Sequence, residues 1–299
     1  MSYNLLNRYI WLVDTIRRFG RITLAQINRQ WEASEFYQGQ PLPRRSFANY
    51  REGAQELFKI TIACDPRTYE YYIEDGGTQH AGGVTSWLLN SAYTNDLLSH
   101  SHDLADRIFV ENVPSAREHL GPVINAMRAY NPIKFDYHAY WRVNPNRGVV
   151  LQPYFLKIFR QRWYLTGRNT ADNKIKTYAL DRMEDVVVGS ECFEPDPAFD
   201  ADEYVSGSFG IVFSQGDVKE VALRTDSRQA KYLRALPLHH SQREAIHDNY
   251  SVFYYRLRLT PDLVQELLSM GSAVTVVSPP ELRAMMVTQL RDTLANYDK

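Results

Sequence analysis

The fold of this chain is decided around residues 160–168, which read Arg160-Gln161-Arg162-Trp163-Tyr164-Leu165-Thr166-Gly167-Arg168. Successive side chains of a β-strand point to opposite faces, so Trp163 and Leu165 share one face. The opposite face carries Arg162, Tyr164, Thr166 and Arg168. We expect the Trp163 and Leu165 face to be buried core, and the opposite face to meet solvent or a ligand.

Short strands surround this stretch. Residues 133–137 alternate, with Ile133, Phe135 and Tyr137 on one face. Apolar and aromatic runs with intervening turns predict further strands at 149–151, 155–159, 163–167, 175–179 and 186–188. Five or six short strands of this kind predict a small β-barrel.

The barrel pattern ends at Glu194-Pro195-Asp196-Pro197, and an αβ tail follows. Its apolar periodicity predicts strands at 218–224, 251–259 and 273–277, and helices at 227–236, at 261–270 and from Pro280 onward. This tail predicts a separate C-terminal domain.

The N-terminal part has helical periodicity. Helices are predicted at 4–18, at 23–31 with Thr23 as the cap, and at 44–58 after Pro41-Leu42-Pro43. Strands at 60–64 and 69–73, joined by Asp65-Pro66-Arg67, predict a hairpin. Three helices and a hairpin are typical of a winged helix-turn-helix.

Paired glycines then mark the exit from this domain. Gly76-Gly77 and Gly82-Gly83 indicate a linker, and helical spacing returns at 84–109 and 123–130. The whole chain is therefore predicted to be an α+β multidomain protein: a winged helix-turn-helix at 1–80, a helical linker at 81–131, a small β-barrel domain at 132–205 and a C-terminal αβ extension domain at 206–299.

The third helix begins with a basic and polar turn. An Asn can pair with adenine and an Arg with guanine, while other Arg and Ser groups hold phosphates. An ordinary solvated helix end is the alternative interpretation. The predicted contacts to double-stranded DNA are Arg44, Arg45, Ser46, Asn49, Tyr50 and Arg51, with Arg67 at the hairpin tip.

Charge is divided unevenly along the chain, although the formal net charge is only -1. Between Lys134 and Arg182 there are ten Lys or Arg residues and three acids, whereas from Asp196 to the end there are eleven bases and fourteen acids. The barrel is therefore predicted to be the electropositive part, which favours an anionic partner.

Membrane, disulfide and catalytic signatures are absent from the sequence. Two cysteines exclude a disulfide framework, and no signal-peptide pattern or apolar run of about 18 residues occurs, so we expect a cytoplasmic protein. No nucleotide-binding Gly loop, HExxH motif or nucleophile elbow is present. The cluster at His100-Ser101-His102-Asp103 is a poor metal site, since helix positions two apart do not share a face. We expect no enzyme, no metal and no cofactor.

The surroundings of residues 160–168 resemble the WYL-domain regulators, named after a Trp-Tyr-Leu tripeptide that corresponds here to Trp163, Tyr164 and Leu165. The similarity includes Phe135-x-Tyr137, Pro153-Tyr154 and Leu180-Asp181-Arg182. One departure is Tyr178-Ala179-Leu180, where the family often has Phe-Arg-Leu, so position 179 is given no ligand role. The resemblance extends into the tail at 236–242, 270–272 and 279–283.

The resemblance implies a winged helix, a WYL domain of the Sm-like or SH3-like barrel type, a C-terminal extension and a homodimer. It also implies that the signature region and the closing Arg form an effector surface. Aromatic rings beside guanidinium groups stack bases and neutralise phosphates, so a nucleotide or single-stranded nucleic-acid effector is expected. A solvated edge, or an ion pair for Arg182, is the alternative. The implied effector residues are Tyr137, Tyr164, Arg160, Arg168 and Arg182.

These expectations combine into a DNA-binding transcriptional regulator, with repressor as the expected sign although activators share these parts. A two-fold dimer predicts an inverted-repeat operator. The alternative function is a nucleic-acid-binding accessory subunit of a defence or repair system, in which the barrel is the working surface.

Overall fold

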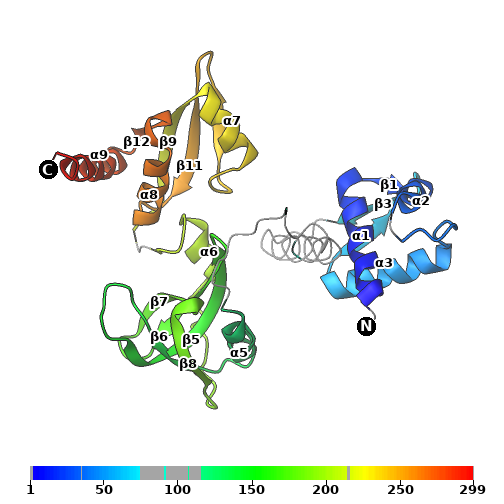
Figure 1. Ribbon diagram of the computed structural model, residues 1–299, viewed down its shortest axis with the longest axis horizontal. Coiled ribbons are helices and arrows are strands. Elements are labelled where there is room, and N and C mark those ends of the chain that lie inside the picture. Colours follow the sequence, from blue (N-terminus) through cyan, green and yellow to red (C-terminus); the bar gives the residue numbers. More distant parts are fainter. Residues whose placement is uncertain are drawn as a thin grey trace. The chain divides into compact units, whose positions relative to one another are not determined.

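The computed structural model describes residues 3–34, 36–74, 116–213 and 216–298, together with positions 91 and 107. The chain divides into two units, Met1–Glu111 and Asn112–Lys299, which are described separately (Figure 1). Most of the predicted linker at 81–131, including His100 and His102, lies outside the described residues. No helix in the described ranges is long and apolar enough to span a membrane.

The first unit contains a small helical core with a three-stranded sheet of order β1-β3-β2. The third helix occupies the predicted range. Three of the four ends of the two hairpin strands differ from the prediction by one residue. The elements are α1 (Tyr3–Phe19), β1 (Ile22–Thr23), α2 (Leu24–Glu32), α3 (Arg44–Phe58), β2 (Thr61–Cys64) and β3 (Glu70–Glu74).

Thr23 begins α2 as predicted. Its side chain accepts a hydrogen bond from the Gln26 amide, and the Gln26 side chain accepts one from the Thr23 amide. This capping box satisfies two amides that the first turn leaves unpaired. The helix then buries Ile27 and Trp31 in the core that also contains Leu12 of α1, so a local sequence signal fixes where the core-facing stripe begins.

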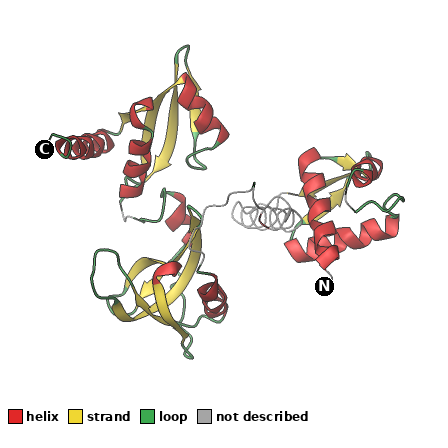
Figure 2. Cartoon of the chain, viewed as in Figure 1, coloured by secondary structure: helices red, strands yellow, loops and turns green. Residues whose placement is uncertain are grey.

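The second unit contains a five-stranded antiparallel sheet of order β7-β6-β5-β4-β8 (Figure 2). Helix α5 (Arg117–Arg128) supplies Val123 and Ala126 to its core. The strands are β4 (Ile133–Tyr137), β5 (Asn146–Phe159), β6 (Arg162–Asn169), β7 (Lys174–Ala179) and β8 (Met183–Val188), with the 3-10 turn η2 (Leu180–Arg182) between the last two.

The sheet differs from the predicted barrel in two respects. The strands predicted at 149–151 and 155–159 form the single strand β5, because Pro153 lies where the register shifts and the ladder tolerates a residue without an amide hydrogen. The edge strands β7 and β8 share no ladder among the described residues, so no closed barrel is found.

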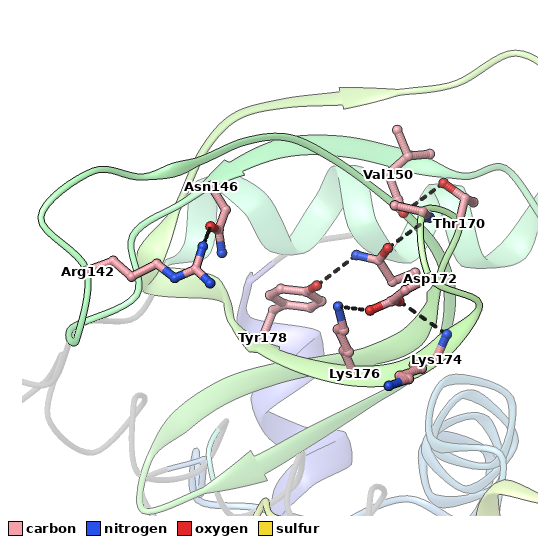
Figure 3. A network of polar contacts seen from close by, with 10 residues as sticks. Arg142, Asn146, Val150, Thr170, Asp172, Lys174, Lys176 and Tyr178 are labelled. Atoms are coloured by element: carbon pink, nitrogen blue, oxygen red, sulfur yellow. Dashed lines mark hydrogen bonds and ion pairs between the residues drawn. The ribbon is translucent and has the colours of Figure 1, made fainter.

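The β6–β7 turn is held by short-range polar contacts (Figure 3). The buried Asn169 side chain donates to the Tyr178 hydroxyl at 3.0 Å, and its carbonyl oxygen accepts from the Ala171 amide. Asp172 forms an ion pair with Lys176 at 2.5 Å. One of the basic residues counted in the middle of the chain is therefore occupied by a structural contact.

A second sheet, of order β10-β11-β9-β12, belongs to the C-terminal part. Its chain order is strand, helix, two strands, helix and strand, and α7 and α8 pack on the face that carries Leu223 and Phe253. The elements are α6 (Ala201–Ser206), β9 (Lys219–Asp226), α7 (Ser227–Ala235), β10 (Arg243–Ile246), β11 (Tyr250–Leu257), α8 (Pro261–Ser269), η3 (Gly271–Ala273), β12 (Val274–Ser278) and α9 (Pro280–Ala295). The sequence predicted this tail except for α6, η3 and β10.

The end of β5 contacts the C-terminal part. The Lys157 ammonium donates to the Gly210 carbonyl at 2.5 Å, and the Phe159 ring meets Phe209 edge-on at 5.6 Å. Burial lowers the pKa of Lys157 to about 8. Burial, followed by the charges of His240 and Lys157, lowers the pKa of His239 to about 4. The junction therefore holds two basic groups that are costly to charge.

Replacing Gly167 by Ala should destabilise the five-stranded sheet. An added Cβ would lie 2.2 Å from the Gln152 carbonyl oxygen, which is backbone and cannot swing away. We expect a loss of about 1–3 kcal/mol in the free energy of unfolding, measured by urea denaturation. Gly121→Ala in α5 is the control, since no atom lies within 4 Å of its added Cβ. Equal midpoints for the two variants would contradict this packing.

Stability should fall on acidification because His239 resists protonation in the folded state. Its pKa drops from 6.5 to about 4, so the unfolded chain binds the extra proton between these values. The free energy of unfolding is then highest above pH 6.5 and decreases toward pH 4. Urea denaturation at several pH values should show a shallower decrease for His239→Gln, whereas His240→Gln keeps His239 buried and retains most of it.

Candidate nucleic-acid and effector sites

The first turns of α3 present basic and polar groups to solvent. Pro43 caps the helix with an extended backbone and no side-chain hydrogen bond. Arg44, Arg45 and Asn49 are exposed, while Phe47 and Ala54 are buried on the opposite side. Of the six predicted DNA contacts on this helix, these three have the accessibility that a contact to a base edge or phosphate requires.

Tyr50 is a correction to the predicted set. Its ring is 8% exposed and meets Tyr9 at a centroid distance of 6.1 Å, and its hydroxyl accepts a hydrogen bond from Arg8 at 2.7 Å. A ring held in this way cannot reach DNA. The helical spacing of Phe47, Tyr50 and Ala54 already indicates a core-facing stripe, and this signal would have excluded Tyr50.

The remaining predicted contacts lie at the edge of this surface. Ser46 and Arg51 are half-buried, and the Arg51 guanidinium lies 5.9 Å from the Tyr71 ring centroid. Arg67 is exposed in the hairpin turn, where its amide donates to Asp65 at 2.9 Å and is the first cause of the lowered pKa of that carboxyl. The turn also exposes Tyr69, which sequence reasoning missed.

Two of the predicted effector arginines are occupied by carboxylates. Arg160 pairs with Glu266 of α8, and Arg168 pairs with Asp196. Arg162, on the same strand face as Arg168, pairs with the nearly buried Asp181. Part of the positive charge of the middle segment is therefore neutralised, because each of these three guanidinium groups has a carboxylate partner.

Arg182 has no ion pair among the residues that the structure describes. Its guanidinium lies 3.5 Å from the centroid of the Tyr140 ring. A hydrogen bond from Arg162, followed by the charge of Arg182, lowers the pKa of the Tyr140 hydroxyl. Tyr140 is 74% exposed, so an aromatic ring and two arginines meet at the surface. We call Tyr140, Arg162, Asp181 and Arg182 the arginine–tyrosine cluster.

Three buried polar atoms of this cluster lack a hydrogen-bond partner in the described part of the chain. They are Nε of Arg162, Oδ1 of Asp181 and Nε of Arg182. Buried polar groups in native proteins are nearly always satisfied, by protein, water or a ligand. Nε atoms of Arg8, Arg51 and Arg168 share this property, so the unpaired atoms mark the cluster as polar and buried but do not by themselves identify a ligand.

A hollow of about 610 Å³ adjoins the cluster. Acids dominate its lining, and His138 pairs there with Glu184 at 2.9 Å. A polyanion would therefore be repelled inside the hollow and attracted only at its Arg182 rim. The lining residues are Glu118, His119, His138, Tyr140, Asp181, Arg182, Met183, Glu184 and Asp185.

The loop between β4 and β5 exposes further apolar surface beside the cluster. Trp141 is 79% exposed and Val143 fully exposed. Sequence reasoning did not select Tyr140 or Trp141, although two adjacent aromatic residues in a turn-rich connection are a usable signal. Exposed aromatic rings beside guanidinium groups suit the stacking of a nucleobase.

Tyr137 and Tyr164 are further corrections. Each is 7% exposed, and the Tyr137 hydroxyl accepts a hydrogen bond from the Ala179 amide at 3.3 Å. Thr166 and Leu165 are both buried, so β6 is covered on both faces, whereas Trp163, expected in the core, is only half-buried. The two tyrosines are buried side chains of the sheet, not an exposed ligand-contacting surface.

Metal chemistry has no support in the described ranges. No group of three or more His, Cys, Asp or Glu side chains there could hold a metal ion. Cys192 is exposed, and its thiol lies 3.3 Å from the Asn131 side-chain oxygen.

Two family models match the chain. The model of the WYL domain matches residues 118–188, and the model of the WCX domain matches residues 217–294. The resemblance seen in the sequence is therefore confirmed for the five-stranded sheet and for the C-terminal extension. A search of curated proteins found no match.

Similar solved structures include proteasome accessory factor B/C (PafBC) of Arthrobacter aurescens. It is 20% identical, with a TM-score of 0.34, and the match covers 95% of this chain and 46% of that one. A CRISPR Cas-related protein is 12% identical, with a TM-score of 0.38, and the match covers 92% of this chain and 71% of that one. The chain thus spans less than half the length of the first.

Proposed function

Because the chain carries a WYL domain followed by a WCX domain, we propose that it is a DNA-binding transcriptional regulator whose WYL domain senses a nucleotide or single-stranded nucleic acid. The observation that carries the proposal is the first part of α3, where Arg44, Arg45 and Asn49 stand exposed on a helix whose other face is core.

Three helices and a small sheet in the first unit support a winged helix-turn-helix. Helix α3 is the third helix, its outer face carries two arginines and an asparagine, and the β2–β3 hairpin follows as the wing. A recognition helix reads base edges in the major groove with such side chains. Arg67 and Tyr69 at the hairpin tip are suited to the neighbouring phosphates.

The arginine–tyrosine cluster is the proposed effector site. Arg182 supplies a guanidinium without a carboxylate partner among the described residues, and Tyr140 and Trp141 supply exposed rings. We assign one phosphate to Arg182 and a stacked base to the Tyr140–Trp141 loop. The acidic hollow beside it confines the anion to the rim, which favours a short strand with spaced phosphates over a compact polyphosphate.

Regulation follows from differential binding. In a homodimer on an inverted-repeat operator, only some arrangements of the two DNA-binding units fit both half-sites. The effector changes how often the dimer adopts such an arrangement. The effector must therefore bind one arrangement more tightly than the other. Repression relieved by the effector is the expected sign.

Removing two of the exposed groups of α3 should weaken specific duplex binding. Each bidentate base contact is worth about 1–3 kcal/mol, so Arg45→Ala with Asn49→Ala should weaken binding by tenfold or more. The operator is first selected from a random duplex library, and affinity is then measured by fluorescence anisotropy at fixed salt.

Arg128→Ala is the matched control, because Arg128 is exposed on α5 in the second unit and removes the same charge. Unchanged operator affinity in the α3 double variant would refute the DNA assignment. If the wild-type chain binds single strands but no duplex, the accessory-subunit alternative is favoured instead.

Arg182→Ala should leave operator affinity intact and remove the response to the effector. The measured quantity is the change in operator affinity when a single-stranded ten-nucleotide DNA is added. Tyr140→Ala should weaken the response by about fivefold or more, because one base loses its stacking partner. Arg160→Ala, whose guanidinium pairs with Glu266, serves as the control. A full response in Arg182→Ala would contradict this effector site.

A further inference from the structure

The four-stranded sheet of the WCX domain has one face that the described helices leave open. Residues of β9 and β11 alternate, and the core-facing set, such as Leu223 and Phe253, packs on α7 and α8. Apart from the small, buried Ala222, the other face consists of exposed or half-buried side chains. The members on the two central strands are Glu220, Ala222, Arg224, Asp226, Tyr250, Val252, Tyr254 and Arg256.

One end of this open face carries a stack of three side chains. The Arg224 guanidinium lies 4.2 Å from the centroid of the Tyr250 ring. The His247 ring lies 4.4 Å from the same ring, with an interplanar angle of 19°. Arg224 and His247 therefore both pack against the Tyr250 ring. We call these residues the Arg224 stack.

The Arg224 stack has the properties of a ligand-binding surface. Arg224 makes no ion pair with any carboxylate in the described ranges, in contrast to Arg234 and Arg243 on the same domain, which pair with Glu244 and Glu220. A hollow of about 470 Å³ adjoins it, lined by Arg224, Ile246, His247, Asp248, Asn249 and Tyr250. Ile246 is 71% exposed at its edge.

The strand order and the position of these residues narrow the ligand class. An antiparallel four-stranded sheet with two helices on one face is the architecture on which RNA-recognition motifs present aromatic side chains from the central strands. Here the arginine and the tyrosine come from the central strands β9 and β11, at neighbouring register positions, since Arg224 pairs with Val252 and Tyr250 with Asp226. Aromatic and guanidinium planes are sequence-tolerant partners for bases.

We propose that the open face of the WCX sheet is a second binding surface for single-stranded nucleic acid. A base stacks on the outer face of His247, and Arg224 donates to the adjoining phosphate. Ile246 covers the sugar edge. This surface shares no residue with the arginine–tyrosine cluster, so it does not depend on the effector site proposed for the WYL domain.

The test uses the full chain and a fluorescein-labelled strand of ten thymidines whose central base is 5-iodouracil. Near-ultraviolet light cross-links iodouracil to stacked aromatic side chains, and mass spectrometry then identifies the attached peptide. We expect attachment at His247 or Tyr250. Arg224→Ala with His247→Ala should weaken the binding of the strand by about tenfold, the loss typical of one stacked base. Arg224→Lys keeps the charge but loses the planar guanidinium, so its affinity for the strand should lie between those of the wild type and the double variant.

Matched variants separate the possible outcomes. Arg228→Ala removes an exposed arginine from α7, on the covered side of the sheet, and should bind as the wild type does. Arg182→Ala should retain the attachment at His247 even if the WYL site fails. Attachment confined to the Tyr140–Trp141 loop, or wild-type affinity in the Arg224 and His247 double variant, would overturn the proposal. Sedimentation that shows the double variant turning a dimer into monomers, with unchanged affinity for the strand, would also overturn the proposal, because the open face would then be a subunit interface.

Discussion

The ion pair between Arg162 and Asp181 is the contact on which the WYL domain depends. Strand β6 is covered on both faces, so a charged side chain there needs a partner of opposite charge. Asp181 supplies it from the 3-10 turn η2, and its side chain is itself only 8% exposed. Pairing fixes the turn, and the turn fixes the next residue, Arg182, against Tyr140. A structural requirement of the strand thus positions the guanidinium that remains available.

Local signals predicted much of the fold. The cap at Thr23, the proline entry to α3 and the alternation of β4 each act within a few residues, and the structure agrees with all three. The single strand β5 was missed because Pro153 and its neighbours look like a break in the sequence, whereas pairing with β6 on one side carries the strand across the bulge. Whether the strand continues past Pro153 therefore depends on pairing within the sheet and cannot be predicted from the neighbouring residues alone.

The candidate sites were less predictable, because they depend on partners far apart in the chain. Nothing near Arg160 or Arg168 indicates that Glu266 and Asp196 neutralise them. Tyr137 and Tyr164 resemble ligand aromatics in sequence, yet both are buried, because both faces of the sheet are covered. Conversely, Tyr140 matters because its ring is exposed, and Arg224 because its guanidinium has no carboxylate partner in the described ranges. Both properties can be judged only when the neighbours in space are known.

The continuous strand β5 has a mechanical consequence. Fourteen residues in extended form reach roughly 45 Å, and hydrogen bonding to β6 along most of that length makes β5 a stiff rod rather than a tether. Its first half pairs with β4, whose end leads into the Tyr140 loop, and its last residues touch Gly210 and Phe209. Its ladders are irregular at two places, opposite Phe135–Tyr137 of β4 and between Pro153 and Phe155. A small tilt imposed at one end of β5 is therefore transmitted to the other end as a displacement, and these two irregularities are where the strand can bend.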